Sequence, residues 1–184
     1  MRRCRIAHLA GIVLLLVATA CASVEPVDPR DPGLSLIYGY LDMEEAPTEA
    51  DWVFIKHYDG KGEGYRVPVQ DGVFYHVGVP AGPYQVDAFG GRSFWNGSYI
   101  YDFGSDGRNA TAIKVNEPGV YFMGAHKYID IPTGWLEQRK FSMEPVETPS
   151  EREVLSKVLE LLREDDPEFA RQIWLVEQRL AQNW

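Results

Sequence analysis

Short apolar segments rich in β-branched and aromatic residues recur through residues 34–146, separated by clusters of Gly, Pro, Asn and Asp. This spacing is typical of an all-β domain, because a strand needs only a few residues and each turn needs residues that tolerate tight backbone angles. The pattern predicts nine strands: Leu34–Asp42, Trp52–Tyr58, Tyr65–Val69, Val73–Val79, Tyr84–Phe89, Tyr99–Phe103, Ala112–Val115, Val120–Ile129 and Leu136–Met143. Nine strands suffice for two packed sheets, so we expect a mainly β fold, an antiparallel β-sandwich.

Two local patterns indicate how particular strands pair and face. Asp71-Gly72 lies between two apolar segments and predicts a tight antiparallel hairpin, because such turns require positive φ angles. In the strand expected at residues 84–89, apolar and polar residues alternate, which predicts one buried and one wet face. The buried positions would be Tyr84, Val86 and Ala88.

The last part of the chain, residues 147–184, has helical rather than strand periodicity. Thr148 offers an N-cap hydroxyl, and Pro149 suits the first helical position. The side chain of Glu151 is placed to accept a hydrogen bond from the backbone N–H of the N-cap residue. Asp166-Pro167 interrupts the apolar stripe and starts a second one. We therefore expect a C-terminal pair of amphipathic helices with two apolar stripes: Val154, Leu155, Val158, Leu159 and Leu162, then Phe169, Ile173, Val176 and Leu180.

The first twenty residues have the order of an export signal. Three arginines precede an apolar run at residues 9–18, which is too short to span a bilayer. Ala18-Thr19-Ala20-Cys21 resembles the lipobox of bacterial lipoproteins, which implies that Cys21 is lipidated and begins the mature chain. The alternative is an ordinary cleavage after Ala20 that leaves a free thiol. Residues 21–33 contain three prolines and would form an extended tether.

The lipoprotein resemblance implies a location as well as an anchor. Two or three acyl chains make membrane attachment essentially permanent, because each buried methylene contributes about 0.8 kcal/mol. Ala22 and Ser23 follow the cysteine, so Ala22 would be the second residue of the mature chain. Lipoproteins of diderm bacteria without Asp at this second position are sorted to the outer membrane. We expect a lipid-anchored protein of the cell envelope, at the outer membrane.

The charge balance excludes one class of partner. Loss of the signal would lower Lys+Arg from 18 to 15 against 27 Asp+Glu, for a net charge of −12. A surface this acidic repels phosphate backbones, so nucleic acid is not expected as a partner. The acidic residues at 42–51 are interpreted as a solvated loop. Oligomeric state has no signature in the sequence.

A second resemblance concerns the fold. Asp71-Gly72-Val73-Phe74 opens one expected strand, and Pro80-Ala81-Gly82-Pro83-Tyr84 leads into the next. This arrangement resembles carboxypeptidase-regulatory-like, transthyretin-like β-sandwich domains, with their Asp-Gly-x-Phe and Pro-x-Gly-x-Tyr signatures. The resemblance implies a transthyretin-like sandwich with a structural, adhesive or accessory role. An immunoglobulin-like sandwich fits the strand spacing as well.

Motifs for catalysis are weak. His57, His76 and His126 all fall in expected strands and would have to converge to bind a metal. Asp59 with residues 60–64, and the segment 102–109, carry oxygen ligands but lack the register of a calcium loop. We expect no metal, no cofactor and no enzymatic activity. A metal-dependent or carboxylate-based hydrolase remains the alternative from the enzyme class.

Aromatic residues are the remaining candidates for binding. Tyr99 and Tyr101 share a strand face and lie close in sequence to Trp95, so these three residues are predicted to bind a ligand such as a glycan. The other interpretation places the tyrosines in the core. Trp174 and Trp184 of the helical tail are the candidates for contact with an envelope protein, unless the helices simply cover the sandwich. The expected function is a lipid-anchored, non-catalytic binding or structural module, with a carbohydrate-binding module as its alternative.

Overall fold

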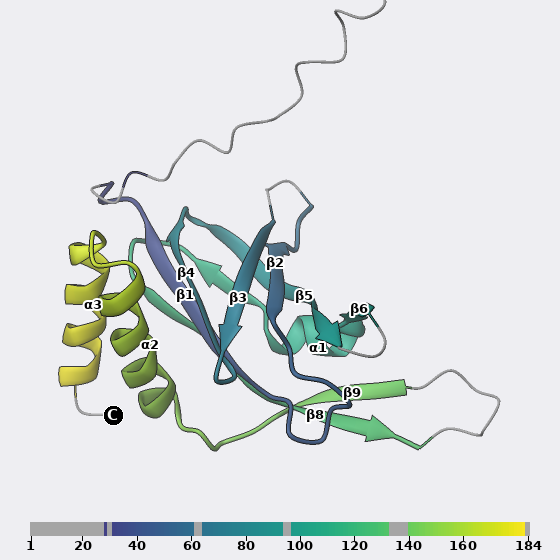
Figure 1. Ribbon diagram of the computed structural model, residues 1–184. Coiled ribbons are helices and arrows are strands. Elements are labelled where there is room, and N and C mark those ends of the chain that lie inside the picture. The colour runs from purple at the N-terminus through teal and green to yellow at the C-terminus, as the bar shows by residue number, and fades with distance from the viewer. Residues whose placement is uncertain (1–27, 29–30, 61–63, 94–96, 133–139, 183–184) are drawn as a thin grey trace, which may run out of the picture.

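The computed structural model describes residues 28, 31–60, 64–93, 97–132 and 140–182. Nine strands and three helices form in this part of the chain (Figure 1). Their bounds are β1 Ser35–Asp42, β2 Trp52–His57, β3 Tyr65–Gln70, β4 Val73–Val79, β5 Gly82–Ser93, β6 Gly97–Asp102, α1 Gly104–Ala110, β7 Ile113–Val115, β8 Val120–Ile131, β9 Lys140–Pro145, α2 Glu151–Asp165 and α3 Ala170–Ala181. The mainly β class, the two C-terminal helices and the positions of the first eight predicted strands are confirmed, whereas the first half of the predicted strand Leu136–Met143 lies outside the described residues.

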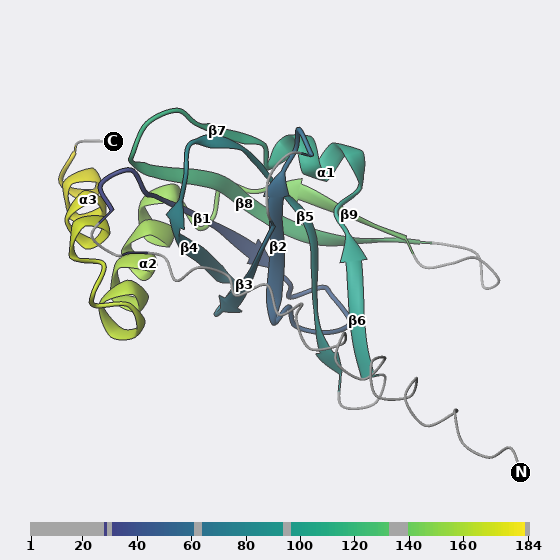
Figure 2. The ribbon, with the colours of Figure 1, turned by 90° about the horizontal axis from the view of Figure 1, so that it is seen from above.

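Hydrogen bonds link the strands into one curled sheet shaped like a half-barrel. The order is β6-β5-β2-β3-β4-β1-β8-β9, with β7 added beside β5. The corner is β3, which pairs with β2 through residues 65–68 and with β4 through Val69 and Gln70. Figure 2 shows the two halves turned toward one another on either side of this corner.

The pairing is antiparallel except between β1 and β8, where the expectation of a wholly antiparallel fold is wrong. Neighbouring parallel strands need a long connection, and here the whole segment from β2 to β7 lies between them in sequence. Opposite Gly39 the register shifts, and Gly124 takes a φ of 100° that favours glycine. This bulge bends β8 along the curl.

The predicted hairpin at Asp71-Gly72 is confirmed. The two residues have φ angles of 51° and 79°, and Val69 faces Phe74 across the antiparallel pair. The prediction for Ala88 is wrong, because the register of β5 against β2 shifts near Asp87 and the core position passes to Phe89. A bulge of this kind exchanges the faces of the residues that follow it.

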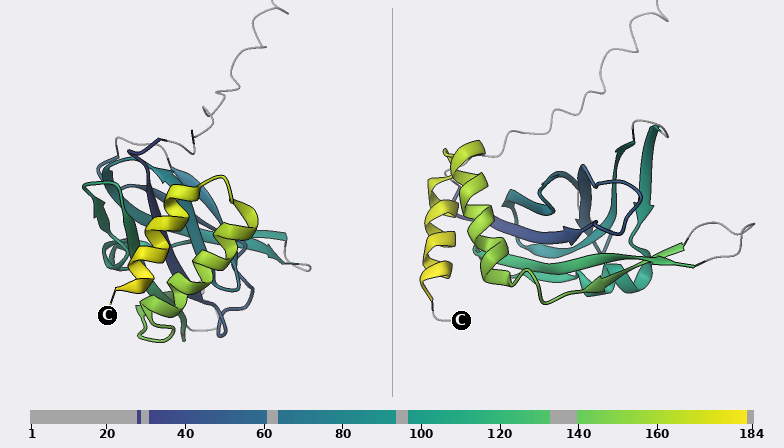
Figure 3. Two further views of the ribbon diagram at one scale, coloured as in Figure 1. Left: turned by 90° about the vertical axis from the view of Figure 1, so that its left-hand side faces the viewer. Right: turned by 60° about the horizontal axis from the view of Figure 1, so that its bottom comes forward.

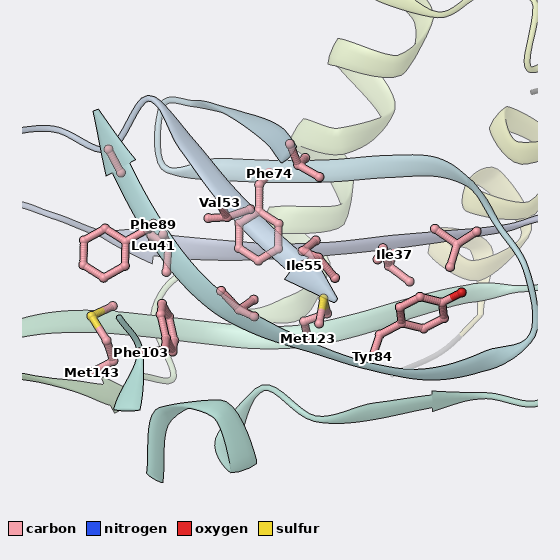
Figure 4. Packing of buried hydrophobic residues seen from close by; sticks show 14 of the residues in the cluster. Ile37, Leu41, Val53, Ile55, Phe74, Tyr84, Phe89, Phe103, Met123 and Met143 are labelled. Carbon is pink, nitrogen blue, oxygen red and sulfur yellow. The ribbon is translucent and has the colours of Figure 1, made fainter. Parts of the chain in front are cut away.

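The concave face of the sheet encloses the main core (Figure 4). Gly39 permits this packing, because a Cβ there would lie 2.4 Å from the Phe74 ring. The strands β6 and β9 form the two ends of the sheet, and we call the line along which these ends meet the seam. Side chains, and not backbone hydrogen bonds, make the contacts across the seam. The ring of Phe141 from β9 lies 5.7 Å from Phe89 and 5.0 Å from Tyr101, both edge to face.

A second core lies on the convex face, under α2 and α3. These helices pack on β1, β4 and β8, as the left-hand view of Figure 3 shows. The Tyr38 hydroxyl donates to Glu151 at the start of α2 (3.0 Å), and the Tyr75 hydroxyl donates to Asp166 at its end (2.8 Å). The helices therefore cover one face of the sheet.

Two details of the helices correct the sequence interpretation. The N-cap of α2 is Ser150 rather than Thr148, and Ser150 forms a capping box with Glu153. Pro149 precedes the helix. Residues 104–110, for which the sequence pattern predicts no helix, form α1. This helix is held by Arg108, which pairs with Asp87 (2.7 Å) and with Asp102.

Truncation in the second core tests how strongly the helices are attached. Leu155→Ala is expected to lower the free energy of unfolding by about 3 kcal/mol, because Leu155 is fully buried between α2 and the sheet. Ser156→Ala, on the exposed side of the same helix, should change it by less than about 0.5 kcal/mol. Urea unfolding measures both. Equal effects of the two substitutions would contradict the packing of α2 against the sheet.

Candidate functional site

A row of non-charged residues crosses the convex face of the half that α2 and α3 leave uncovered. Strand register places Pro68 beside Trp52, Trp52 beside Gly90, and Gly90 beside Ile100, so the row spans β3, β2, β5 and β6. Pro68 is exposed, and 71% of the Ile100 surface is exposed. We call this surface, with Arg66 added, the open face.

The centre of the open face is the indole of Trp52. It lies over the backbone of Gly90, where a Cβ would come within 2.6 Å of the ring. The guanidinium of Arg66 stands 4.5 Å from the ring centroid, which is the geometry of a cation–π contact. The strand glycine therefore lets a large aromatic side chain lie low against the sheet, beside an exposed cation.

A shallow pocket of about 590 Å³ opens beside this indole. Its polar groups come from neighbouring strand ends. The Arg92 backbone N–H donates to the Asp51 carboxylate (2.8 Å), and the Tyr99 hydroxyl donates to the carbonyl of Glu49. Burial is the main cause that raises the pKa of Tyr99. The pocket thus offers guanidinium donors, one carboxylate acceptor, an aromatic surface and the Ile100 side chain.

The two arginines at this pocket differ from most other cations in the described part of the chain. Lys56, Arg108 and Lys127 each pair with a carboxylate at 2.7–2.9 Å. Neither Arg66 nor Arg92 forms an ion pair with any described residue. In a chain of net charge −9, two guanidinium groups at one pocket without carboxylate partners form a local site for negative charge.

Two of the predicted ligand-binding residues, Tyr99 and Tyr101, have rings in contact at 5.2 Å, but only Tyr99 lines the pocket. Tyr101 packs against Phe89 and Phe141 at the seam, as the core interpretation held. Among the other predicted sites, Trp174 is 54% exposed on α3. Cys21, Trp95 and Trp184 lie outside the described residues.

The residues that the sequence did not single out are Trp52, Arg66 and Arg92. Trp52 and Arg66 lie in confirmed strands, and both alternate with buried valines, Val53 and Val67. That alternation already assigns Trp52 and Arg66 to the face away from the core. Which strands would stand side by side, and which face would remain uncovered, depends on the tertiary fold.

The histidines form two separate environments. His57 contacts Tyr84 at 4.4 Å, Tyr84 lies 6.2 Å from Tyr65, and Tyr65 contacts His76 at 4.4 Å. His126 lies elsewhere, with its Nε2 3.2 Å from the carbonyl of Met123. Across the residues that the structure describes, no three His, Cys, Asp or Glu side chains lie close enough to hold a metal ion.

One acid–base pair occurs in the first histidine group. His57 Nδ1 lies 3.5 Å from the Asp59 carboxylate, an arrangement that can orient an imidazole. The other side of that imidazole lies directly against Gly82, where a Cβ would meet Cε1 at 2.6 Å and Nε2 at 3.0 Å. Gly82 thus lies close to the ring because it lacks a side chain, and 16% of the His57 side chain remains exposed.

A larger pocket, of about 700 Å³, belongs to the loop between β1 and β2. Carboxylates line it, and one neighbouring member of the loop, Glu45, pairs with Lys127 at 2.9 Å. This is the segment that the sequence predicts to be a solvated loop, and Asp51 lines both this pocket and the pocket of the open face. The larger pocket supplies negative charge and one aromatic side chain, Tyr40, whose ring lies against Gly72.

Comparisons with known proteins identify no family. No family model matches the chain, and no curated protein matches it. One solved structure is similar over 59% of this chain, a leucine-rich repeat protein from Bacteroides thetaiotaomicron VPI-5482, with 10% identity and a TM-score of 0.33. The chain spans 15% of the length of that protein. No helix among the described residues has the length and apolar character needed to cross a membrane.

The half-buried histidine of β4, His76, predicts a dependence of stability on pH, because its Nε2 atom is buried. Burial lowers the pKa of His76 from 6.5 to about 4. Between pH 6.5 and about pH 4 the unfolded chain binds the proton and the folded chain does not. The free energy of unfolding therefore falls as the pH falls through this window. The contribution of His76 is complete above pH 6.5 and is lost as the pH falls toward 4, a change on the order of 2 kcal/mol.

His76→Phe keeps a ring against Tyr65 and removes this titration. The free energy of unfolding of the variant, measured by urea titration at several pH values, should fall less steeply than that of the wild type across the window. Burial also lowers the pKa of His126, which is unchanged in the variant, so the difference between the two proteins isolates His76. Parallel curves for both proteins would contradict a neutral imidazole at this position.

Proposed function

We propose that this chain is a lipid-anchored, non-catalytic binding module of the bacterial cell envelope, and that the open face is its binding surface. The observation that carries the proposal is the asymmetry of the two convex halves. One is buried under α2 and α3, whereas the other presents Trp52, Arg66, Pro68 and Ile100 to solvent. Aromatic and arginine side chains are enriched among residues that dominate binding energies.

The anchor supplies the mechanism of action. Lipidation at Cys21 would confine the domain to a membrane surface, and the proline-rich tether at residues 21–33 would hold it a short distance away. Confinement raises the effective concentration of the open face near other envelope components, so that weak contacts become occupied. The outer membrane is the proposed location, from the residues that follow Cys21.

Binding rather than catalysis fits the composition of the open face. Its groups can stack, donate hydrogen bonds and carry charge, which are the interactions of a binding surface. The nearest acid, Asp51, accepts a backbone hydrogen bond from Arg92. The histidine–carboxylate pair of His57 and Asp59 does not line the pocket of the open face.

For the fold, we propose that the curled sheet is a β-sandwich of the carboxypeptidase-regulatory-like, transthyretin-like type. The two halves enclose a common core, and β3 passes from one half to the other after Pro68. The Pro80–Tyr84 segment that carries the resemblance connects β4 to β5, which belong to opposite halves. Tyr84 is fully buried in the core, as that turn requires.

Binding to isolated envelope material tests the proposed surface. We expect the purified full-length protein to co-sediment with the insoluble polysaccharide and peptidoglycan fraction of a diderm bacterium. Ile100→Ser should weaken this binding about tenfold, because it removes an exposed apolar side chain from the open face. Ile131→Ser, which removes an exposed apolar side chain of the same type from the end of β8, is the matched control and should bind as the wild type does. Equal binding by all three proteins would contradict the open face as the site.

Fractionation of cells tests the anchor. The wild-type protein is expected in the detergent-soluble membrane fraction, and mass spectrometry should find acyl chains on Cys21. Cys21→Ser should remove the lipid and leave the protein in the unprocessed or soluble form, because the hydroxyl does not form the thioether. An unmodified thiol at Cys21 in the wild-type protein would refute lipidation.

A further inference from the structure

We propose that the ligand of the open face is an acidic saccharide, a polymer or oligomer whose sugar rings carry carboxylate groups. This inference rests on the proposed function and adds the ligand class. It comes from the combination of an aromatic platform with two arginines that have no ion-pair partner among the described residues.

Charge is the first step. Arg66 and Arg92 line one pocket with a single carboxylate, Asp51, so the pocket is positive within an acidic chain. Guanidinium groups bind carboxylates through paired N–H donors, and these hydrogen bonds are stronger than those between neutral groups. Long-range repulsion by the negative protein would oppose any anion that lacked such local contacts. The geometry therefore favours a ligand whose charges are spaced to meet the two arginines.

The aromatic surface is the second step. The Trp52 indole lies low over Gly90, and the exposed Ile100 continues the apolar surface beyond it. Sugar rings present C–H groups on one face and hydroxyl groups around the edge, so they stack on such a surface while remaining hydrated at the rim. Arg66 now stands over the indole, and a stacked uronic acid ring would exchange this contact for a bond between its carboxylate and the guanidinium.

Hydrogen bonding is the third step. The pocket combines donors from both arginines with the acceptor oxygens of Asp51, and Ser98 adds a hydroxyl that both donates and accepts. A polyhydroxylated ring needs this mixture of donors and acceptors. An acidic peptide would use the arginines, but it lacks the ring of hydroxyl groups that this mixture of donors and acceptors can bind. A shallow trough across four strands also suits an extended polymer better than a compact ligand.

Calorimetric titration of the full-length protein in detergent tests the inference. The probes are an oligogalacturonate and its methyl ester, which has the same sugar backbone without the charge. We expect the acid form to bind at least about tenfold more tightly than the ester, because each charge-assisted contact with arginine is lost in the ester. Added salt should weaken binding of the acid form and leave that of the ester nearly unchanged.

Matched variants locate the charge effect. Arg66→Gln and Arg92→Gln should each reduce the preference for the acid form by about tenfold. Arg152→Gln removes the same charge from an exposed position on α2 and should leave the preference unchanged. Thermal unfolding checks that the variants are folded.

The outcomes separate the two proposals. Equal binding of acid and ester, or no binding of either, would overturn the acidic-saccharide inference. The proposed function would survive that result if Ile100→Ser still lost its binding to the envelope fraction. Both proposals fail if Ile100→Ser binds that fraction as the wild type does. An equal loss of preference in Arg152→Gln would also overturn the assignment, because it would show a general charge effect.

Discussion

The burial of β1 on both faces is the constraint on which the architecture depends. Ile37 and Leu41 point into the concave core, whereas Leu36 and Tyr38 lie in the core beneath the helices. A strand buried on both sides cannot show the alternation of a half-exposed strand, and residues 35–39 are indeed all buried. The sheet must therefore curl on one side of β1 and be covered by helices on the other, because either apolar face left in water would cost several kcal/mol.

Each of these two requirements is met by specific contacts. The curl depends on close approach at Gly39, where the Phe74 ring takes the space of a side chain, and on the bulge that bends β8 at Gly124. Because β6 and β9 do not pair, aromatic rings close the seam between them. The helical cover is oriented by the hydroxyls of Tyr38 and Tyr75, which fix the two ends of α2. Both tyrosine hydroxyls have raised pKa values, mainly because of burial, and stay protonated donors.

The candidate binding surface follows from the same asymmetry. Since α2 and α3 contact β1, β4 and β8, the convex face of the other half keeps its Trp52 and Ile100 side chains at the surface. Two contacts reduce the exposed area of the Trp52 indole. The ring lies against Gly90, which has no side chain, and the Arg66 guanidinium covers part of it. Such a surface can bind a ligand without forming a large continuous apolar patch that would favour aggregation, because charged groups interrupt its apolar atoms.

The sequence by itself determined what depends on neighbours along the chain. Strand positions, the turn at Asp71-Gly72 and the two terminal helices follow from periodicity and local backbone preferences, which act over a few residues. It also marked Tyr99, which lines the pocket, and Tyr101, which does not. The tertiary structure alone decided the parallel pairing of β1 with β8, the bulge that moved Ala88 out of the core, and the helix at Gly104–Ala110 held by Arg108. It alone brought Trp52, Arg66 and Arg92 to one pocket, because they come from three strands whose adjacency is set by long-range pairing and whose exposure is set by where the helices pack.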